Sequence, residues 1–376
     1  MRVLVLNAGS SSLKAAVLDV GPAGRTTHVT DALVERVGEE GGDAPDHGAA
    51  VRQVLDRLAA DGVHPDAVGH RVVHGGERFT APAVVDDRVV DEVAACVPLA
   101  PLHNPANLAG LRAAREAFAD LPHVAVFDTA FHATVPPAAH RYAVPRDWYE
   151  QHGVRRYGFH GTSHAYVSRR AAALLGREPA DVAVVSAHLG NGASVTAVDG
   201  GVSVDTSMGL GPLPGLVMGT RSGDIDPTVV FHLVREAGWT LDAVEAALNR
   251  ESGLRGLAGS NDLRDVEVAA RAGDEHATLA LDVLAHRLVG YVGAYATLLG
   301  RLDAMVFTAG VGEHSALVRR RVCERLGLLG VTLDHEANEA VAGESRIDGG
   351  TGPAVLVVPT DEEGEIARQV VEVLGA

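Results

Sequence analysis

The stretch VLVLNAGSSSLKAAVLD, residues 3–19, decides the fold that we expect. It begins with an apolar run, Val3–Leu6, continues through a turn of small polar residues and ends in a second apolar run, Ala15–Leu18. Apolar runs of this length on both sides of a glycine-containing turn predict a strand, a turn and a second strand. A turn of small residues also exposes backbone N–H groups, which can surround a phosphate.

A related pattern returns half a chain later in VAVVSAHLGNGASVTAVDGG, residues 182–201. Asn7 then aligns with His188, and Gly9 with Gly190. Two unrelated β-hairpins would give a similar pattern, because glycine turns are common. The spacing of the two patterns favours a duplicated domain.

Strand-like and helix-like patterns alternate along the rest of the chain, which predicts an α/β fold. A chain of 376 residues predicts two domains. The expected strands are 68–73, 123–128 and the start of 305–315, where a GxG turn leads into a helix. The expected helices are 49–60, 163–176 with Thr162 or Ser163 as N-cap, 276–299 ended by Gly300, and a tail in which Thr360 and Glu363 form a capping box and Ile366, Val370, Val373 and Leu374 share a face.

The composition excludes several classes of function. Acidic residues exceed basic ones by 49 − 32 = 17, and a surface this negative repels nucleic acid and anionic lipid. The two cysteines, Cys96 and Cys323, give neither a disulfide framework nor a CxxC pair. No apolar run reaches about 18 residues, and the first one is too short for a signal peptide. We therefore expect a cytoplasmic protein with no nucleic-acid or membrane partner.

The single lysine, Lys14, follows the first turn, whereas the other 31 basic residues are arginines. Codon bias toward arginine would explain this contrast without any role for Lys14. The alternative is that position 14 requires a compact ammonium group, which a guanidinium cannot replace. Its place beside a Gly/Ser turn favours this second interpretation.

Three small-residue turns, 8–12, 190–194 and 310–312, are candidates for phosphate contacts. None matches the Walker A pattern, and the last lacks the third glycine of GxGxxG. Together they fit a cleft between two related domains that holds a polyphosphate from both sides.

Charged residues in apolar or glycine-rich surroundings are the next candidates. Arg71 lies in the strand-like GHRVVHGG, and Arg221 lies in GLVMGTRSGDIDP. Two such arginines can hold a carboxylate and a phosphoryl group, although Arg221 can instead form a structural pair with Asp224 or Asp226. Asp128 ends a strand, where catalytic carboxylates are common and turn residues are equally common.

Other acids and histidines are less specific. Glu362, in the first turn of the last helix, is either a helix-dipole acid or a ligand of Mg²⁺. His160 and His164 are four residues apart, but the glutamate of HExxH is absent and a turn falls between them, which argues against zinc.

In order along the chain, nine motifs closely resemble those of the acetate kinase family. They are NAGSSSLK (7–14), HRVVHGG (70–76), PLHNPAN (101–107), FDTAFH (127–132), RRYGFHGTSH (155–164), HLGNG (188–192), VDTSMG (204–209), MGTRSGDIDP (218–227) and TAGVGE (308–313). The resemblance covers nearly the whole chain. It implies the actin/sugar-kinase/Hsp70-like superfold, with two duplicated actin-like (ribonuclease H-like) domains and the active site in the cleft between them. The implied domains are 1–130 plus 363–376 and 131–362.

The resemblance also implies a role for each matching residue. The implied catalytic residues are Asp128, His160 and Arg221. The implied ligands of Mg²⁺, for which Mn²⁺ can substitute, are Asn7 and Glu362. Substrate binding falls to Arg71 and to an acetate-methyl pocket of Val73, Leu102, Phe159 and Pro212. ATP or ADP binding falls to Lys14, His188, Leu189, Gly190, Asn191, Gly192, Asp262, Leu263, Arg264, Gly310, Val311, Gly312, Glu313 and His314.

The implied activity is the reversible transfer of the ATP γ-phosphoryl group to acetate, which gives acetyl phosphate and ADP in a cytoplasmic homodimer of acetyl-CoA biosynthesis. A carboxylate is already ionised at pH 7 and needs no strong base, so we expect direct transfer in which Asp128 orients a neighbour. Kinases of propionate or butyrate, a pyrophosphate-dependent enzyme and a non-catalytic nucleotide sensor remain alternatives. The chain departs from the family at Gly211 and Pro214 (GPLPG for TPLEG), at His314 and at Asp361, where the family has asparagine.

Overall fold

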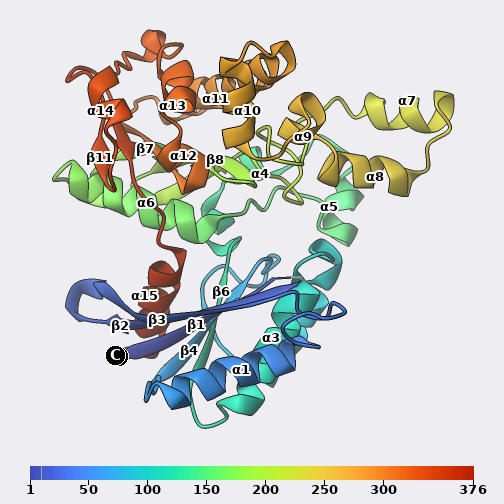
Figure 1. Cartoon of the computed structure of the whole chain (residues 1–376), viewed down its shortest axis with the longest axis vertical. Coiled ribbons are helices and arrows are strands. Elements are labelled where there is room, and N and C mark those ends of the chain that lie inside the picture. Colours follow the sequence, from blue (N-terminus) through green and yellow to red (C-terminus); the bar gives the residue numbers. More distant parts are fainter. Residues whose placement is uncertain (10) are drawn as a thin grey trace. The chain divides into compact units, whose positions relative to one another are not determined.

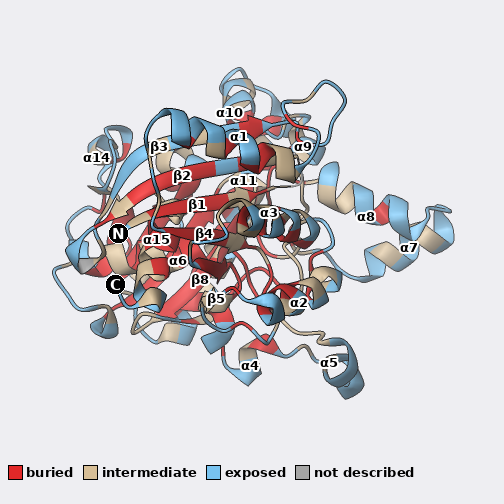
Figure 2. Ribbon diagram, turned by 90° about the horizontal axis from the view of Figure 1, so that it is seen from below, coloured by how far each residue is buried: buried red, intermediate tan, exposed pale blue. Residues whose placement is uncertain are grey.

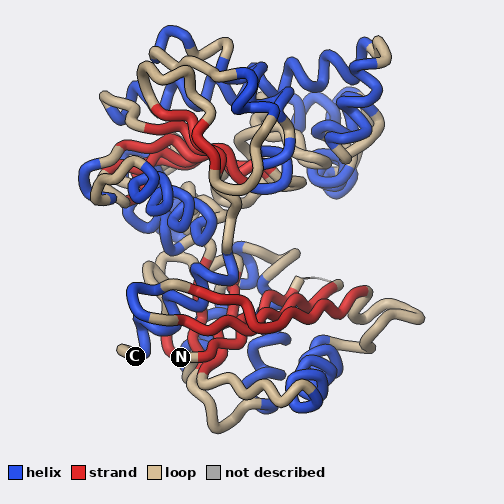
Figure 3. Tube along the Cα trace, turned by 60° about the vertical axis from the view of Figure 1, so that its left-hand side comes forward, coloured by secondary structure: helices blue, strands red, loops and turns tan. Residues whose placement is uncertain are grey.

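The computed structural model of the chain describes residues 1–9 and 11–376, which form two compact units. Ser10, within the turn predicted at 8–12, lies outside the described residues. Each unit holds one six-stranded sheet (Figure 3). The first unit comprises Met1–Ala133, Gly161–Ser163 and Asp361–Ala376, and the second comprises Thr134–His160 and His164–Thr360.

The sheet of the first unit has the strand order β3-β2-β1-β4-β6-β5. Strands β1, β2 and β3 form an antiparallel meander, β4 and β6 run parallel to β1, and β5 is antiparallel to β6. The strands are β1 (Arg2–Ala8), β2 (Ser12–Val20), β3 (Thr26–Glu35), β4 (Ala67–Val72), β5 (Ala83–Val84) and β6 (His123–Phe127).

Alternation along β1 explains how this sheet is covered on both faces. Leu4 and Leu6 pack in a cluster with helices α1 and α3, whereas Val3 and Val5 pack in a cluster with α15. Because helices cover both faces of the sheet, β1 is apolar from Val3 to Leu6 and is buried between the two helix layers (Figure 2). The helices of this unit are α1 (His47–Ala60), α2 (Asp87–Ala95), α3 (Asn104–Ala117) and α15 (Glu362–Leu374) (Figures 1 and 2).

The sheet of the second unit repeats this plan strand for strand, in the order β9-β8-β7-β10-β12-β11. The antiparallel and parallel pairings are the same, and the register shifts at equivalent places, after Val17 in β2 and after Ala197 in β8. The predicted duplication is therefore confirmed. The strands are β7 (Ala183–Leu189), β8 (Ala193–Asp199), β9 (Val202–Thr206), β10 (Ala304–Thr308), β11 (Ser345–Arg346) and β12 (Ala354–Val357).

Helices α11 and α12 pack against strands of this second sheet, α11 on β7 and β8 and α12 on β7 and β10. Helix α11 ends at Gly300, as predicted, because that glycine adopts the left-handed conformation. The helices of the unit are α4 (Pro137–His140), α5 (Arg146–His152), α6 (Gly161–Leu174), α7 (Thr228–Glu236), α8 (Leu241–Arg250), α9 (Gly253–Ala258), α10 (Leu263–Arg271), α11 (Glu275–Leu299), α12 (Ala309–His314), α13 (Ala316–Cys323) and α14 (His335–Glu339); the first three residues of α6 group with the first unit.

Two predicted helix starts are wrong. Helix α6 begins after His160, not after Thr162 or Ser163, because the backbone N–H of Gly161 donates to the carbonyl of Asp128 and fixes the start there. Helix α15 is capped by Asp361, whose carboxylate accepts from the N–H of Gly364. The predicted capping box of Thr360 and Glu363 does not form.

Two further predictions are corrected by backbone geometry and burial. Residues 310–312 belong to helix α12 and are not a turn, because Ala309, with φ of 63°, already makes the change of direction. Val373 lies on the exposed side of α15, whereas Ile366 and Val370 are in the core. Among the described helices, none combines the length and apolar character needed to cross a bilayer.

Candidate active site

An ion pair links the ends of two neighbouring strands in the first unit. Arg71 is on β4, and Asp128 directly follows β6, which pairs with β4 in parallel. The Arg71 guanidinium donates from Nε to Asp128 Oδ1 at 2.9 Å and from Nη2 to Oδ2 at 2.7 Å. This two-point geometry fixes both side chains at the carboxyl ends of the strands, where α/β folds bind ligands.

Burial and charge act in opposite directions on this pair. Burial raises the pKa of the Asp128 carboxyl, and the Arg71 guanidinium opposes the rise. Burial lowers the pKa of Arg71, but the negative charges of Asp128 and Glu362 outweigh it and raise that pKa overall. Both carboxylate oxygens accept from the guanidinium, which is the geometry of an ionised Asp128 paired with a protonated Arg71.

Glu362 is the first residue of α15 and lies beside this pair. Its Oε2 is 3.8 Å from Arg71 Nη2 and accepts from the Thr162 hydroxyl at 3.4 Å. The next residue, Glu363, forms an ion pair with Lys14 of β2, with Nζ 2.5 Å from Oε1. The structure thus brings Arg71, Asp128 and Glu362 together, and it directs the Lys14 side chain to Glu363.

Two buried asparagines near the start of α3 were missed as functional candidates. Asn104 both accepts from the N–H of His74 and donates to its carbonyl, and Asn107 accepts from the N–H of Val73 and donates to the carbonyl of Ala8. They hold the backbone that follows β4 and β1. The sequence feature that could have indicated them is the spacing of two asparagines three residues apart in PLHNPAN, at the start of a helix.

In the second unit, His160 occupies a strained position before α6. Its φ of 56° lies in the left-handed region, which non-glycine residues rarely adopt. The imidazole stacks on that of His188, with ring centroids 4.2 Å apart, and its Nδ1 is 2.9 Å from Ser194 Oγ. Contacts on two sides therefore hold the ring in one orientation.

Arg221 lies on the loop before α7 and is partly buried. Its Nη1 donates to the carbonyl of Pro212 at 2.7 Å, and burial lowers its pKa. No ion pair found among the described residues includes Arg221. The alternative partners are engaged elsewhere, since Asp224 accepts from Tyr291 and from the N–H of Gly215, and Asp226 accepts from the N–H of Thr228.

The HLGNG segment forms the tight turn between β7 and β8. A Cβ atom at Gly192 would lie 3.3 Å from Arg221 Nη2 and 3.5 Å from His160 Nε2. Both nitrogens therefore border the same small space, which a larger residue would fill. The N–H of Gly219 donates to the carbonyl of Asn191, so the loop that carries Arg221 is fixed to this turn.

The segments that we predicted to bind the nucleotide are held by local contacts of their own. Asp262 caps α10 and pairs with the exposed Arg264, which lowers the pKa of Asp262 to about 2. In α12, His314 Nδ1 lies 2.9 Å from the carbonyl oxygen of Gly310. The buried Arg319 donates to the carbonyls of Gly312 and Glu313 and holds the end of this short helix.

The apolar residues predicted for the acetate methyl group differ in exposure. Phe159 is buried, and the carbonyl of Pro212 anchors Arg221. Val73 is held by Asn107, whereas Leu102 is 54 % exposed. Val73 and Leu102 belong to the first unit, and Phe159 and Pro212 to the second.

The first unit contains oxygen donors of the kind that a hard cation prefers. The amide of Asn7, at the end of β1, and the carboxylate of Glu362 are ligand types that Mg²⁺ accepts when phosphates and waters supply the rest of its shell. In the described part of the chain, no group of three His, Cys, Asp or Glu side chains has the arrangement of an all-protein metal site.

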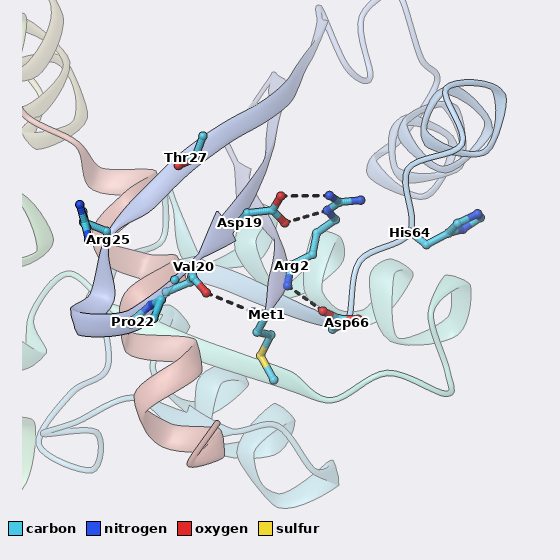
Figure 4. Close-up of a pocket in the computed structure, with 10 residues that line it drawn as sticks. Met1, Arg2, Asp19, Val20, Pro22, Arg25, Thr27, His64 and Asp66 are labelled. Atoms are coloured by element: carbon cyan, nitrogen blue, oxygen red, sulfur yellow. Dashed lines mark hydrogen bonds and ion pairs between the residues drawn. The ribbon is translucent and has the colours of Figure 1, made fainter.

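One hollow of about 570 Å³ lies elsewhere, at the opposite end of β1 (Figure 4). Arg2 forms a two-point pair with Asp19 there, and its backbone N–H donates to Asp66. None of the residues that we predicted for chemistry lines it. We therefore assign the hollow no part in the site.

Two units, each with a six-stranded sheet of the same strand order and the same pairing, define an α/β protein of the duplicated actin-like class. More narrowly, the chain belongs to the acetokinase family, whose model matches residues 2–368.

Individual relatives agree with this assignment over nearly their full length. An acetate kinase of Streptomyces griseus is 53 % identical, with 100 % of this chain and 96 % of the relative covered. The crystal structure of Porphyromonas gingivalis acetate kinase has a TM-score of 0.93 at 42 % identity and 99 % coverage of both chains. A propionate kinase of Francisella tularensis has a TM-score of 0.91 at 39 % identity and 98 % coverage of both.

Proposed function

We propose that the chain is an acetate kinase that transfers the γ-phosphoryl group of ATP reversibly to acetate. Membership of the acetokinase family and full-length similarity to acetate kinases support the activity. The structural observation that carries the proposal is Arg221, a partly buried guanidinium beside His160 that has no carboxylate partner among the described residues. A charge placed in this way needs an anionic ligand.

The chemistry requires alignment and charge neutralisation. A carboxylate oxygen of acetate attacks the γ-phosphorus, the bond to the ADP oxygen breaks, and its electron pair stays on ADP. We assign the carboxylate to Arg71, which Asp128 holds in a fixed orientation at 2.7–2.9 Å. Arg221 and His160 then donate to the equatorial oxygens of the transferred group. No residue has to remove a proton, since acetate is ionised at pH 7.

The remaining predicted residues receive supporting roles in the same proposal. Asn7 and Glu362 would hold Mg²⁺, which when bound neutralises phosphate charge. HLGNG at 188–192, the segment 262–264 and helix α12 would contact the nucleotide. Val73, Leu102, Phe159 and Pro212 would contact the methyl group of acetate.

Hydroxamate trapping of the acyl phosphate, with ATP and Mg²⁺ and each short acid in turn, tests this function. We expect acetate to have the highest kcat/KM, with propionate lower by about 10-fold, since one methylene changes binding by about 1–3 kcal/mol. The propionate kinase with a TM-score of 0.91 makes propionate the alternative substrate. A preference for propionate would overturn the assignment of acetate as the substrate. Formation of product with pyrophosphate but not with ATP would overturn the assignment of ATP as the phosphoryl donor.

The absence of acyl phosphate with every acid and donor would favour the non-catalytic nucleotide sensor. The homodimer, the cytoplasmic location and the domain boundaries at 1–130 with 363–376 and at 131–362 remain proposals. Sedimentation of the purified chain over a range of concentrations tests the first of these.

A further inference from the structure

A chain of buried polar side chains lies behind His160 in the second unit. His164 of α6 has Nδ1 2.7 Å from Ser186 Oγ of β7 and Nε2 2.7 Å from Ser194 Oγ of β8. Ser194 Oγ is in turn 2.9 Å from His160 Nδ1. Ser186, His164 and Ser194 are all 0 % exposed. The reaction as assigned above uses His160 alone and leaves these three groups unexplained.

The count of protons restricts how this chain can be arranged. Each serine hydroxyl has one proton to donate, and a neutral imidazole has one N–H and one bare nitrogen. Ser194 can therefore donate to His160 Nδ1 or to His164 Nε2, but not to both. Each choice fixes every other proton in the chain, because a buried donor or acceptor is costly to leave unsatisfied.

The first arrangement runs in one direction. Ser186 donates to His164 Nδ1, His164 Nε2–H donates to Ser194, and Ser194 donates to His160 Nδ1. Every contact is then a hydrogen bond, and the proton of a neutral His160 must be on Nε2. This nitrogen borders the space beside Gly192 that it shares with Arg221.

The opposite arrangement gives the wrong tautomer. If Ser194 donates to His164, His160 must donate from Nδ1, and a neutral His160 then presents a bare Nε2 lone pair to a phosphoryl oxygen. Double protonation of His160 would supply an Nε2–H in either arrangement. It would place a second positive charge close to Arg221 in a partly buried site, which is unfavourable.

We propose that Ser186, His164 and Ser194 form a one-directional hydrogen-bond chain that holds His160 as the neutral Nε2–H tautomer, with Ser194 as the positioning residue. The partner of Nε2–H, a phosphoryl oxygen, rests on the proposed function. The choice between the two directions rests on it as well, because the contacts within the second unit satisfy both and only the first presents an N–H to that oxygen. The titratable and charged groups around His160 are the guanidinium of Arg221 and the imidazoles of His164 and His188.

Imidazole ¹⁵N spectra of the ¹⁵N-histidine-labelled full chain test the tautomer, with His160→Ala used to assign the signal. We expect His160 to be protonated on Nε2 and bare on Nδ1 at pH 7.5. In Ser194→Ala, the signal should shift toward a mixture of tautomers. A proton on Nδ1 in the unmodified chain, or an unchanged signal in Ser194→Ala, would overturn the proposal. This measurement is independent of turnover, so it separates failure of the tautomer from failure of the proposed function.

Kinetics of the same variant test the positioning role. We expect Ser194→Ala to lower kcat by about 10-fold to 100-fold with KM changed by less than about 3-fold, because only the transition-state donor is affected. The deficit should shrink as the pH is lowered, because an imidazolium has an Nε2–H whatever its neighbour donates. A purely structural defect would give the same deficit at every pH and would overturn the role.

Three further variants complete the design. Ser168→Ala removes a buried serine hydroxyl that donates to the carbonyl of Ala165 within α6, and it should leave kcat within about 2-fold. Ser194→Thr retains the hydroxyl and should recover most of the activity. In a His160→Ala background, Ser194→Ala should cause no further loss, whereas additive losses would show that Ser194 acts without His160.

Discussion

Lys14 and Glu363 form an ion pair, Nζ to Oε1 2.5 Å, that joins the second strand of the first sheet to the first turn of α15. Burial lowers the pKa of Lys14, but the hydrogen bond and charge of Glu363 outweigh it and raise that pKa overall. The single lysine of the chain thus restrains the turn that carries Glu362, the proposed metal ligand. This contact gives position 14 a physical reason for a compact ammonium group.

The first prediction concerns this pair. Lys14→Met should raise the KM for MgATP by about 3-fold to 10-fold, because the turn that presents Glu362 loses a restraint. Lys14→Arg should have a smaller effect in the same direction. Since the Lys14 side chain is 51 % exposed, the free energy of unfolding should fall by less than about 1 kcal/mol.

A double-mutant cycle with Glu363→Gln separates two roles for Lys14. If Lys14 acts through Glu363, each single variant has a similar effect and the double variant is no worse. If Lys14 contacts the phosphates directly, Glu363→Gln leaves ATP use nearly unchanged. Unchanged kinetics in Lys14→Met would leave codon bias as the explanation of the single lysine.

The second prediction concerns Arg221. Arg221→Ala should lower kcat by at least about 10²-fold, as loss of a transition-state charge does. Its effect on thermal unfolding should be small, because no carboxylate among the described residues loses a partner. Arg170→Ala, which breaks a surface pair with Glu344, is the matched arginine control and should retain full activity. Normal turnover in a folded Arg221→Ala protein would contradict the mechanism.

Local patterns predicted the repeated sheets well, because each first hairpin is an apolar run on either side of a small-residue turn. Helix starts were less predictable. Local preference favours Thr162 or Ser163 as the cap of α6, yet a Cβ at Gly161 would lie 2.2 Å from the carbonyl oxygen of Asp128. Packing on that carbonyl, not a local cap, therefore sets where the helix begins.

The sequence predicted individual site residues, but it did not predict which of them contact one another. That Asp128 binds Arg71 depends on β4 and β6 being neighbours, which sequence spacing does not reveal. The role of Ser194 depends on the register of a hairpin: it lies opposite His188, just as Lys14 lies opposite Asn7. Equivalent positions in the two duplicated hairpins thus provide the contacts to Glu363 and to His160.

The third prediction separates orientation from proton transfer at Asp128. Asp128→Asn should lower the free energy of unfolding by about 3 kcal/mol, because Arg71 loses a buried ionised partner. The KM for acetate should rise as Arg71 becomes misplaced. The kcat of the unmodified enzyme should be independent of pH between about 6 and 9, since no residue acts as a base. If kcat instead rises with pH, and Asp128→Asn abolishes that rise, Asp128 acts as a general base.

The last prediction concerns stability in acid and rests on a buried histidine pair in the first unit. His70 Nε2 lies 2.8 Å from His123 Nδ1, and burial, with the charges of His123 and Arg115, lowers the pKa of His70 to about 3. In the unfolded chain this pKa is about 6.5. Between these values the unfolded chain binds the additional proton, so acid favours unfolding.

The free energy of unfolding should therefore fall by about 1.4 kcal/mol per pH unit for this group as the pH decreases from about 6 toward 3. His70→Gln retains an N–H donor for His123 Nδ1 but cannot be protonated, so its stability should depend less on pH in this range. Urea unfolding at pH 7.5, 6, 5 and 4 measures both slopes. His28→Gln, which alters a half-exposed histidine of the same sheet, is the control and should retain the slope of the unmodified chain. Parallel curves for the unmodified chain and His70→Gln would show that His70 is not the group that titrates.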